Sequence, residues 1–234
     1  MPASGAYSSQ QLGIYQYRML TSVMRLNAAL ASDINASWTP DPTSIVAELL
    51  TRWRDRLGTL ILRFHETVIR DSAGFIFQFV GQKNEQLEFL LNFIRPELRQ
   101  YGARTAALIE GYLRNRINNE RSSGKPQQEV LKTISRILRS RGYARRIAYT
   151  EVHTAVERGM WEAANSLGAR MKKEWVSRED SSVRFAHAVA HGQTTLITQP
   201  FTVGGEALMY PGDGNASARN RVNCRCTLNY ILEG

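Results

Sequence analysis

The sequence predicts an α+β protein, with a mainly helical N-terminal body and a small C-terminal mixed α/β module of short strands. Apolar residues recur at steps of three and four residues from about residue 7 to residue 167, the spacing of amphipathic helices. After residue 172 the chain becomes rich in Gly, Thr, Val and turn residues, with short extended runs. At 234 residues and 43% hydrophobic content, the chain is long enough to bury a substantial core.

The first half of the chain predicts helices separated by proline and glycine signals. We expect a loose terminus over residues 1–6, a helix over 7–31, and a long helix that begins at residue 43 or 44. Gly74 and Gly81 bracket a short aromatic run, so an interruption is expected there. A helix over 83–94 is expected to stop before Pro96, which starts the next helix.

The second half predicts two more helices and then the strands. A turn at 122–126 precedes a helix over 127–140, with Gly142 as a left-handed cap. A last long helix spans 144–167, with Gly168 able to close it. Short strands are expected at 173–176, 200–203 and 222–231, and Asp180 or Ser181 is expected to cap a helical stretch over 181–190.

These elements suggest three parts. Residues 1–42 form an N-terminal helix and a linker that contains Pro40 and Pro42. Residues 43–168 form a helical body with an Arg-rich segment over 99–146, and residues 169–234 form the C-terminal module.

The net charge of +9 is concentrated in the Arg-rich segment. Residues 99–146 hold twelve Lys and Arg against three Glu, an excess equal to the net charge of the whole chain. Most of these cations are arginine, whose planar guanidinium binds two phosphate oxygens at once. A solvated helical face and a phosphate-rich partner both fit this pattern. The candidate DNA-binding residues are Arg114, Arg116, Arg121, Lys125, Lys132, Arg136, Arg139, Arg141, Arg145 and Arg146.

Metal-ligating residue types gather in the C-terminal module. His187 and His191 are four residues apart, which on a helix places both rings on one face. Cys224 and Cys226 alternate on an extended segment, so both thiols point to the same side. Together they offer the four ligands of a structural zinc site, although the cysteine spacing is shorter than in most zinc motifs. Buried, hydrogen-bonded core residues and a Cys–His nucleophilic pair are the alternatives.

Glu151 is expected to be partly buried on the last long helix and to need a cation. Arg184 is the candidate partner. The cysteines are too close for an unstrained disulfide, which indicates a reducing compartment. The absence of a leader and of a long apolar run predicts that no membrane takes part in assembly.

Several short motifs resemble one known family in order and spacing. They are Ile147 to Glu151, Trp175, Asp180, Arg184, His187, Gly192, Phe201 to Gly205, Tyr210 to Asp213, and Asn223 to Cys226. Residues 147–228 thereby resemble the phage Mu F-like minor head proteins, also called phage head morphogenesis proteins. Glu151, Trp175, Asp180, Arg184 and Asn223 are the structural residues of this pattern. His191 falls where members vary.

The resemblance implies a structural minor capsid protein of a tailed double-stranded DNA phage, without enzymatic activity and without a required cofactor. Such a protein is assembled in the host cytoplasm and lies inside the virion near the portal vertex. It implies the portal protein and packaged DNA as partners, with scaffold or major capsid protein as further ones. A His/Cys metal-dependent nuclease or hydrolase is the alternative function. A delivery module joined to a toxin is the third, although no effector is expected in the eight residues after Cys226.

Overall fold

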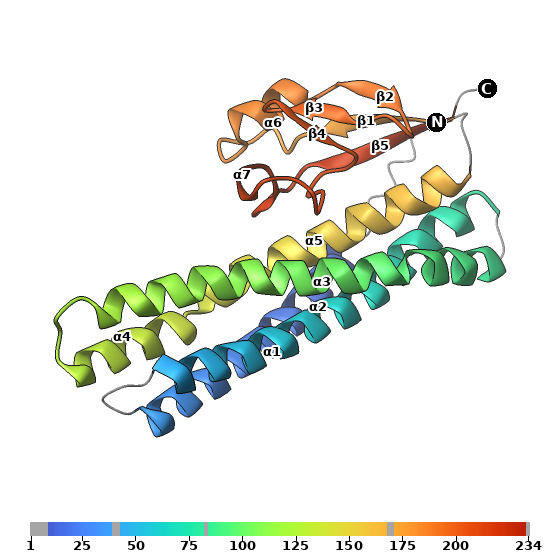
Figure 1. The fold of residues 1–234 in the computed structure, drawn as a ribbon. Helices are drawn as coiled ribbons and strands as arrows, with labels where there is room; N and C mark the ends of the chain where they lie inside the picture. Colours follow the sequence, from blue (N-terminus) through green and yellow to red (C-terminus); the bar gives the residue numbers. More distant parts are fainter. Residues whose placement is uncertain (1–8, 39–42, 82–83, 168–170, 233–234) are drawn as a thin grey trace. The chain divides into compact units, whose positions relative to one another are not determined.

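The computed structural model describes residues 9–38, 43–81, 84–167 and 171–232 and confirms the α+β class. Five helices precede a C-terminal region of short antiparallel strands (Figure 1). The expected loose terminus, the two linker prolines and Gly168 lie outside the described residues. Among the described residues, no helix combines the length and apolar character that a membrane span requires.

The described residues form seven helices and five strands. The helices are α1 (Ser9–Ser37), α2 (Thr43–Phe79), α3 (Asn84–Arg121), α4 (Gln127–Leu138), α5 (Arg141–Ser166), α6 (Phe185–Ala190) and α7 (Ala218–Arg221). The strands are β1 (Met171–Val176), β2 (Thr194–Leu196), β3 (Phe201–Val203), β4 (Glu206–Leu208) and β5 (Thr227–Leu232).

Packing divides the chain into two compact units, and several long helices run from one into the other. The bundle unit comprises Gln16–Arg63 and Pro96–Ala148. The module unit comprises the described residues up to Tyr15, Phe64–Arg95, and the residues from Tyr149 onward. The division into separate domains at residues 43–168 and 169–234 remains a prediction.

The bundle unit has an apolar core built from the inward faces of its helices. Its largest fully buried side chains include Leu57 and Ile61 of α2 and Leu113 and Ile117 of α3. These pairs stand four residues apart, so each pair forms one stripe along its helix. The predicted helical periodicity is therefore confirmed by burial.

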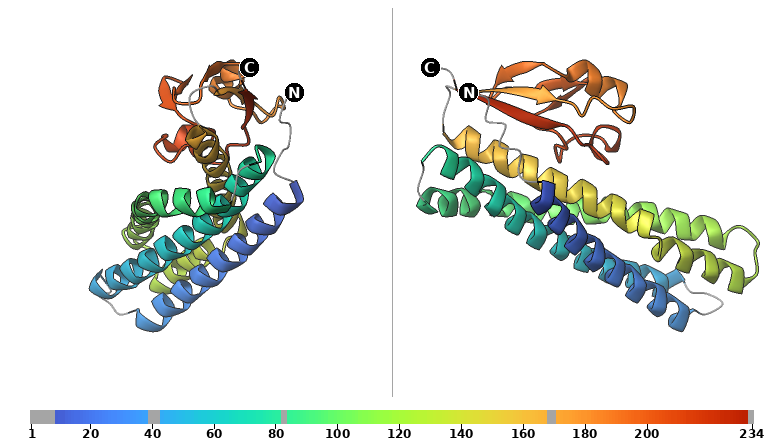
Figure 2. Two further views of the ribbon diagram at one scale, coloured as in Figure 1. Left: turned by 90° about the vertical axis from the view of Figure 1, so that its right-hand side faces the viewer. Right: turned by 180° about the vertical axis from the view of Figure 1, so that it is seen from behind.

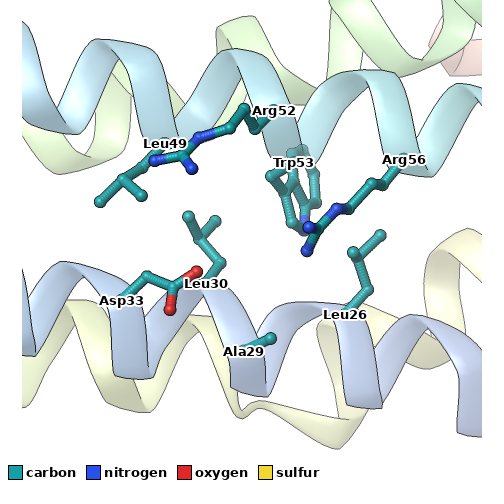
Figure 3. Close-up of a pocket in the computed structure, with 8 residues that line it drawn as sticks. All are labelled: Leu26, Ala29, Leu30, Asp33, Leu49, Arg52, Trp53 and Arg56. Carbon is teal, nitrogen blue, oxygen red and sulfur yellow. The ribbon is translucent and has the colours of Figure 1, made fainter.

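A groove between α1 and α2 lies within the bundle unit. Figure 3 shows Arg52 and Arg56 reaching over it from α2. At its side, the buried Trp53 indole donates a hydrogen bond to the Asn27 side-chain oxygen at 3.1 Å. This bond satisfies the buried indole N–H group and determines which faces of α1 and α2 contact each other.

The module unit contains two small antiparallel sheets. The first has the strand order β2-β1-β5, with Lys173 paired with Thr195 on one side and Tyr230 on the other. The second is the hairpin of β3 and β4. Figures 1 and 2 show the strands lying along the C-terminal part of α5, which belongs to the same unit.

Trp175 forms the centre of the module's core. Its side chain is fully buried on β1, with the Phe201 ring 5.4 Å and the His187 ring 5.7 Å away, both edge-on. The turn at Gly212 has φ +75° and packs against α5, where Thr154 donates to its carbonyl at 2.8 Å. A side chain at Gly212 would also crowd His153, because its Cβ would lie 3.2 Å from that ring.

Two predicted helix interruptions are wrong. α2 continues through Gly74, and α3 continues through Pro96. Proline removes one helical hydrogen bond, a loss of about 3 kcal/mol in a helix interior. The buried residues Ile94 and Leu98 continue the apolar stripe on both sides of Pro96, and their packing keeps the helix together.

Smaller differences concern the elements that follow. Gly142 lies in the first turn of α5 rather than capping α4, whose last residue is followed by Arg139 as its cap. The strands at 173–176, 200–203 and 222–231 are confirmed as β1, β3 and β5, with β5 beginning only at Thr227. The sequence did not predict β2 and β4, because three-residue strands leave almost no alternation pattern.

Candidate functional site

The candidate site gathers three buried side chains from two separate segments of the module unit. His187 projects from α6, while Cys224 and Cys226 lie just before β5. The His187 Nδ1 atom stands 3.4 Å from the Cys226 sulfur and 3.7 Å from the Cys224 sulfur. All three ligand atoms lie within 4.8 Å of one another, the arrangement of a potential metal site.

The local backbone explains why both thiols face the histidine. Asn223 adopts φ +55°, a left-handed conformation that asparagine tolerates better than most residues. Its N–H donates to the Thr150 hydroxyl on α5 at 3.1 Å. The next three residues then alternate, so that both cysteines are buried and Arg225 is exposed. The predicted same-side placement of the thiols is confirmed.

The two thiols differ in their electrostatics. The pKa of Cys224 is raised, first because its thiol donates to Cys226 and then because it is buried. The pKa of Cys226 is lowered, chiefly by that same hydrogen bond. On α5, burial and the neighbouring Cys224 raise the pKa of the Glu157 carboxyl well above its usual value. Of the two thiols, Cys226 is therefore the more easily deprotonated.

His191 does not join this cluster, contrary to the four-ligand prediction. α6 ends at Ala190, so the helical geometry that would align His191 with His187 is not continued. Instead, the His191 Nδ1 atom accepts a hydrogen bond from the Ser177 N–H at 3.1 Å. The structure thus brings together three of the four predicted ligands.

Glu151 is buried as predicted, but its predicted partner is wrong. Its carboxylate lies 3.3 Å from His65 Nε2 and 3.7 Å from the Arg221 guanidinium. Arg184 donates instead to the Val222 carbonyl. Burial lowers the pKa of His65, and the neighbouring Glu151 carboxylate opposes this shift. The sequence offered no signal for this pairing, because His65 and Arg221 are far apart in the chain.

Asp180 also has a different role from the predicted helix cap. The N-cap of α6 is Arg184, and no side chain among the described residues caps that helix. The Asp180 carboxylate binds both terminal nitrogens of Arg225 at 2.6 and 2.7 Å and accepts from the Ser182 N–H. The Arg225 guanidinium holds the pKa of Asp180 below its usual value. This pair ties the loop before α6 to the segment between the cysteines.

Sequence reasoning missed Lys173, which is fully buried on β1. Its ammonium donates to the Met209 carbonyl at 2.7 Å and lies 5.0 Å from the Phe201 ring centre. Burial lowers the pKa of Lys173 to about 8. A lysine in an alternating strand is normally assigned to the solvent face, so the sequence pattern alone does not reveal it.

The predicted DNA-binding residues all belong to the bundle unit, and eight of the ten are exposed. Glu110 pairs with Arg114, and Glu120 pairs with Lys125. Arg121 lies 5.9 Å from the Trp38 ring centre. Within the described part of the chain, Arg136, Arg139 and Arg146 make no ion pair. The ten lie on α3 (Arg114, Arg116, Arg121), the following loop (Lys125), α4 and its cap (Lys132, Arg136, Arg139) and α5 (Arg141, Arg145, Arg146).

Comparison with known proteins identifies one family. The model for phage Mu protein F like protein matches residues 112–229, half of the chain. This match begins well before residue 147, so it includes most of the Arg-rich segment as well as the candidate site. No solved structure matches the chain.

Two curated proteins are similar to parts of the chain. An uncharacterized protein, YqbB of Bacillus subtilis (strain 168), is 28% identical over 170 residues, 71% of this chain and 55% of that protein. The NAD(+)–arginine ADP-ribosyltransferase EFV of Enterococcus faecalis (strain ATCC 700802 / V583) is 29% identical over 116 residues, 47% of this chain and 23% of that protein. The chain thus spans about half or less of the relatives it matches.

Proposed function

The chain belongs to the phage Mu protein F-like family, and we propose that it is a non-enzymatic minor head protein that binds packaged DNA without sequence preference. The family is one of phage head morphogenesis. The observation that supports DNA contact is the concentration of exposed cations on α4 and the adjoining turns of α3 and α5. Cations that contact phosphates bind duplex DNA with no need to read bases.

DNA binding is tested by measuring affinity for duplex DNA at several salt concentrations. The logarithm of the association constant should fall by about 0.9 per phosphate contacted for each unit of log salt. Reversing Arg136, Arg139 and Arg146 to Glu should weaken binding and reduce this slope by roughly 3. The matched control reverses Arg18, Arg25 and Arg56, which are also exposed in the bundle unit. Equal losses in both variants, or a salt-insensitive affinity, would refute the assignment of this surface.

We also propose the portal protein as the main protein partner, with a position inside the virion near the portal vertex. The family membership supports this proposal. A pull-down of purified portal protein with this chain is expected to recover a complex that survives high salt. Failure to recover it, with major capsid or scaffold protein captured instead, would place the protein elsewhere in the head.

A metal-dependent nuclease or hydrolase is the alternative, since the three-residue cluster offers metal ligands. The transferase activity of the Enterococcus faecalis relative is not part of either proposal, because the match spans 23% of that protein. Incubation with duplex DNA and Zn²⁺ or Mg²⁺ is expected to give no cleavage. Cleavage that disappears in His187→Ala would favour the alternative.

A further inference from the structure

Two of the three distances among the ligand atoms in the module unit are close to those around a zinc ion. Zinc binds thiolate sulfur at about 2.3 Å and imidazole nitrogen at about 2.0–2.1 Å, so tetrahedral neighbours of these two kinds stand about 3.6 Å apart. The His187 Nδ1 atom lies 3.4 Å from one cysteine sulfur and 3.7 Å from the other. Small shifts of the side chains would make both distances equal to the edge length of one zinc tetrahedron.

The neighbourhood of the cysteines holds acidic groups and buried polar atoms without partners. Within the described residues, His153 Nε2 and Glu157 Oε2 are buried and make no hydrogen bond. Both lie on α5, four residues apart, and both interact with the Cys224 thiol. Unpartnered polar groups are costly in a protein interior. A bound cation would favour the ionised forms of the two thiols and of the Glu157 carboxyl.

The ligands are held by structure that does not depend on a metal. α6 positions His187, and the left-handed turn at Asn223 directs both sulfurs toward it. The ion pair between Asp180 and Arg225 joins the same two segments from outside. A small surface pocket that includes Val183 and Arg184 reaches His187 and both cysteines, which gives an ion a path of entry.

We propose that His187 Nδ1, Cys224 Sγ and Cys226 Sγ bind one Zn²⁺ ion as its three protein ligands, with water in the fourth tetrahedral position. Two thiolates and an imidazole form a soft donor set that suits zinc rather than magnesium or calcium. The short cysteine spacing is no obstacle, because the extended backbone turns both sulfurs to one side. The ion would cross-link α6 to the segment before β5 and so stabilise the module unit.

The test is zinc content and stability of the full chain purified under reducing conditions. Elemental analysis should find one zinc ion per chain, and a strong chelator should lower the Tm. Zn²⁺ binding should weaken in each of the variants Cys224→Ser, Cys226→Ser and His187→Ala. The loss should exceed the tenfold to hundredfold that is typical when a residue that only hydrogen-bonds to a metal ligand is replaced. His191→Gln is the matched control and should retain zinc, because His191 contacts Ser177 instead.

A second measurement guards against variants that fail to fold. Titration of metal-free wild-type protein with Co²⁺ should give one equivalent of a visible spectrum with thiolate charge-transfer bands and tetrahedral intensity. A wild-type protein that binds neither Zn²⁺ nor Co²⁺, with a chelator-insensitive Tm, would overturn the proposal. So would zinc loss in His191→Gln equal to that in Cys226→Ser. These results are independent of DNA binding, which is tested on other residues.

Discussion

The bundle unit and the module unit differ in the side chains that they bury. Both contain a well-packed apolar core. Among the described residues, however, most buried polar groups belong to the module unit. They are His65, Ser72, Thr150, Glu151, His153, Thr154, Glu157, Arg158, Lys173, Ser177, His187, Asp213 and Asn220, against Asn27, Thr105 and Glu110 in the bundle unit.

This difference separates two ways of specifying a fold. A helical stripe of Leu and Ile accepts many apolar substitutions of similar volume, so the bundle unit is free to vary while its surface carries charge. A buried ion pair or lysine accepts few replacements, because each change leaves a partner unsatisfied. The short sequence motifs of the chain accordingly lie mostly in the module unit. The bundle unit instead shows the general residue pattern of amphipathic helices.

The largest expected effect comes from removing the buried charge of Glu151. Glu151→Gln removes a carboxylate that is 2% exposed and faces the His65 ring and the Arg221 guanidinium, which should lower the free energy of unfolding by about 3–5 kcal/mol. The matched change in the bundle unit is Glu48→Gln, which removes an exposed pair with Arg52 within one helix. That change should cost less than about 1 kcal/mol. Urea unfolding of both variants measures the contrast, and equal losses would contradict it.

Lys173 should make the module unit more stable at alkaline pH. Its folded pKa of about 8 lies below the usual lysine value of 10.5, so the unfolded chain binds more protons between these values. The free energy of unfolding should therefore rise with pH across this window, by about 3 kcal/mol in total. Lys173→Met should remove this rise, as measured by urea unfolding at pH 7, 8, 9 and 10. An unchanged slope in the variant would assign the effect to other groups.

Tight helix packing in the module unit should make one glycine hard to replace. A Cβ at Gly159 on α5 would overlap the Ser72 hydroxyl and lie 3.0 Å from the Ile69 backbone. Gly159→Ala is therefore expected to cost about 1–3 kcal/mol. Gly111→Ala on α3 meets nothing within 4 Å and should stabilise the chain by up to about 1 kcal/mol. Thermal unfolding of the two variants measures the change in Tm. A change of the same sign in both variants would contradict the prediction.

The smallest effect on stability is expected where the largest effect on DNA binding is proposed. Arg136→Glu and Arg139→Glu change exposed side chains of the bundle unit. Each should alter the free energy of unfolding by no more than about 0.5 kcal/mol. A loss above that in urea unfolding would mean that these arginines support the fold.

The sequence allowed the helices and the main strands to be predicted because periodic burial leaves a pattern in the residue order. The buried stripe of α4, for example, follows directly from Val130, Ile134 and Leu138. The alternation at Cys224 and Cys226 likewise predicted two thiols on one side.

The features that could not be predicted from the sequence depend on contacts between distant segments. The continuity of α3 through Pro96 depends on packing that outweighs a local preference. The partners of Glu151 and the burial of Lys173 arise from three-dimensional packing, and no local pattern marks them. His191 was assigned to the site because a helix was assumed to continue one residue further than it does.

The placement of charge along the chain has a consequence for how the protein meets a partner. Residues 99–146 hold an excess of cations equal to the whole net charge, and all of them belong to the bundle unit. A polyanion would therefore attract the Arg-rich helices more strongly than the rest of the bundle unit before contact. Attraction of this kind raises the rate of productive encounter, and it fades once salt shortens the Debye length.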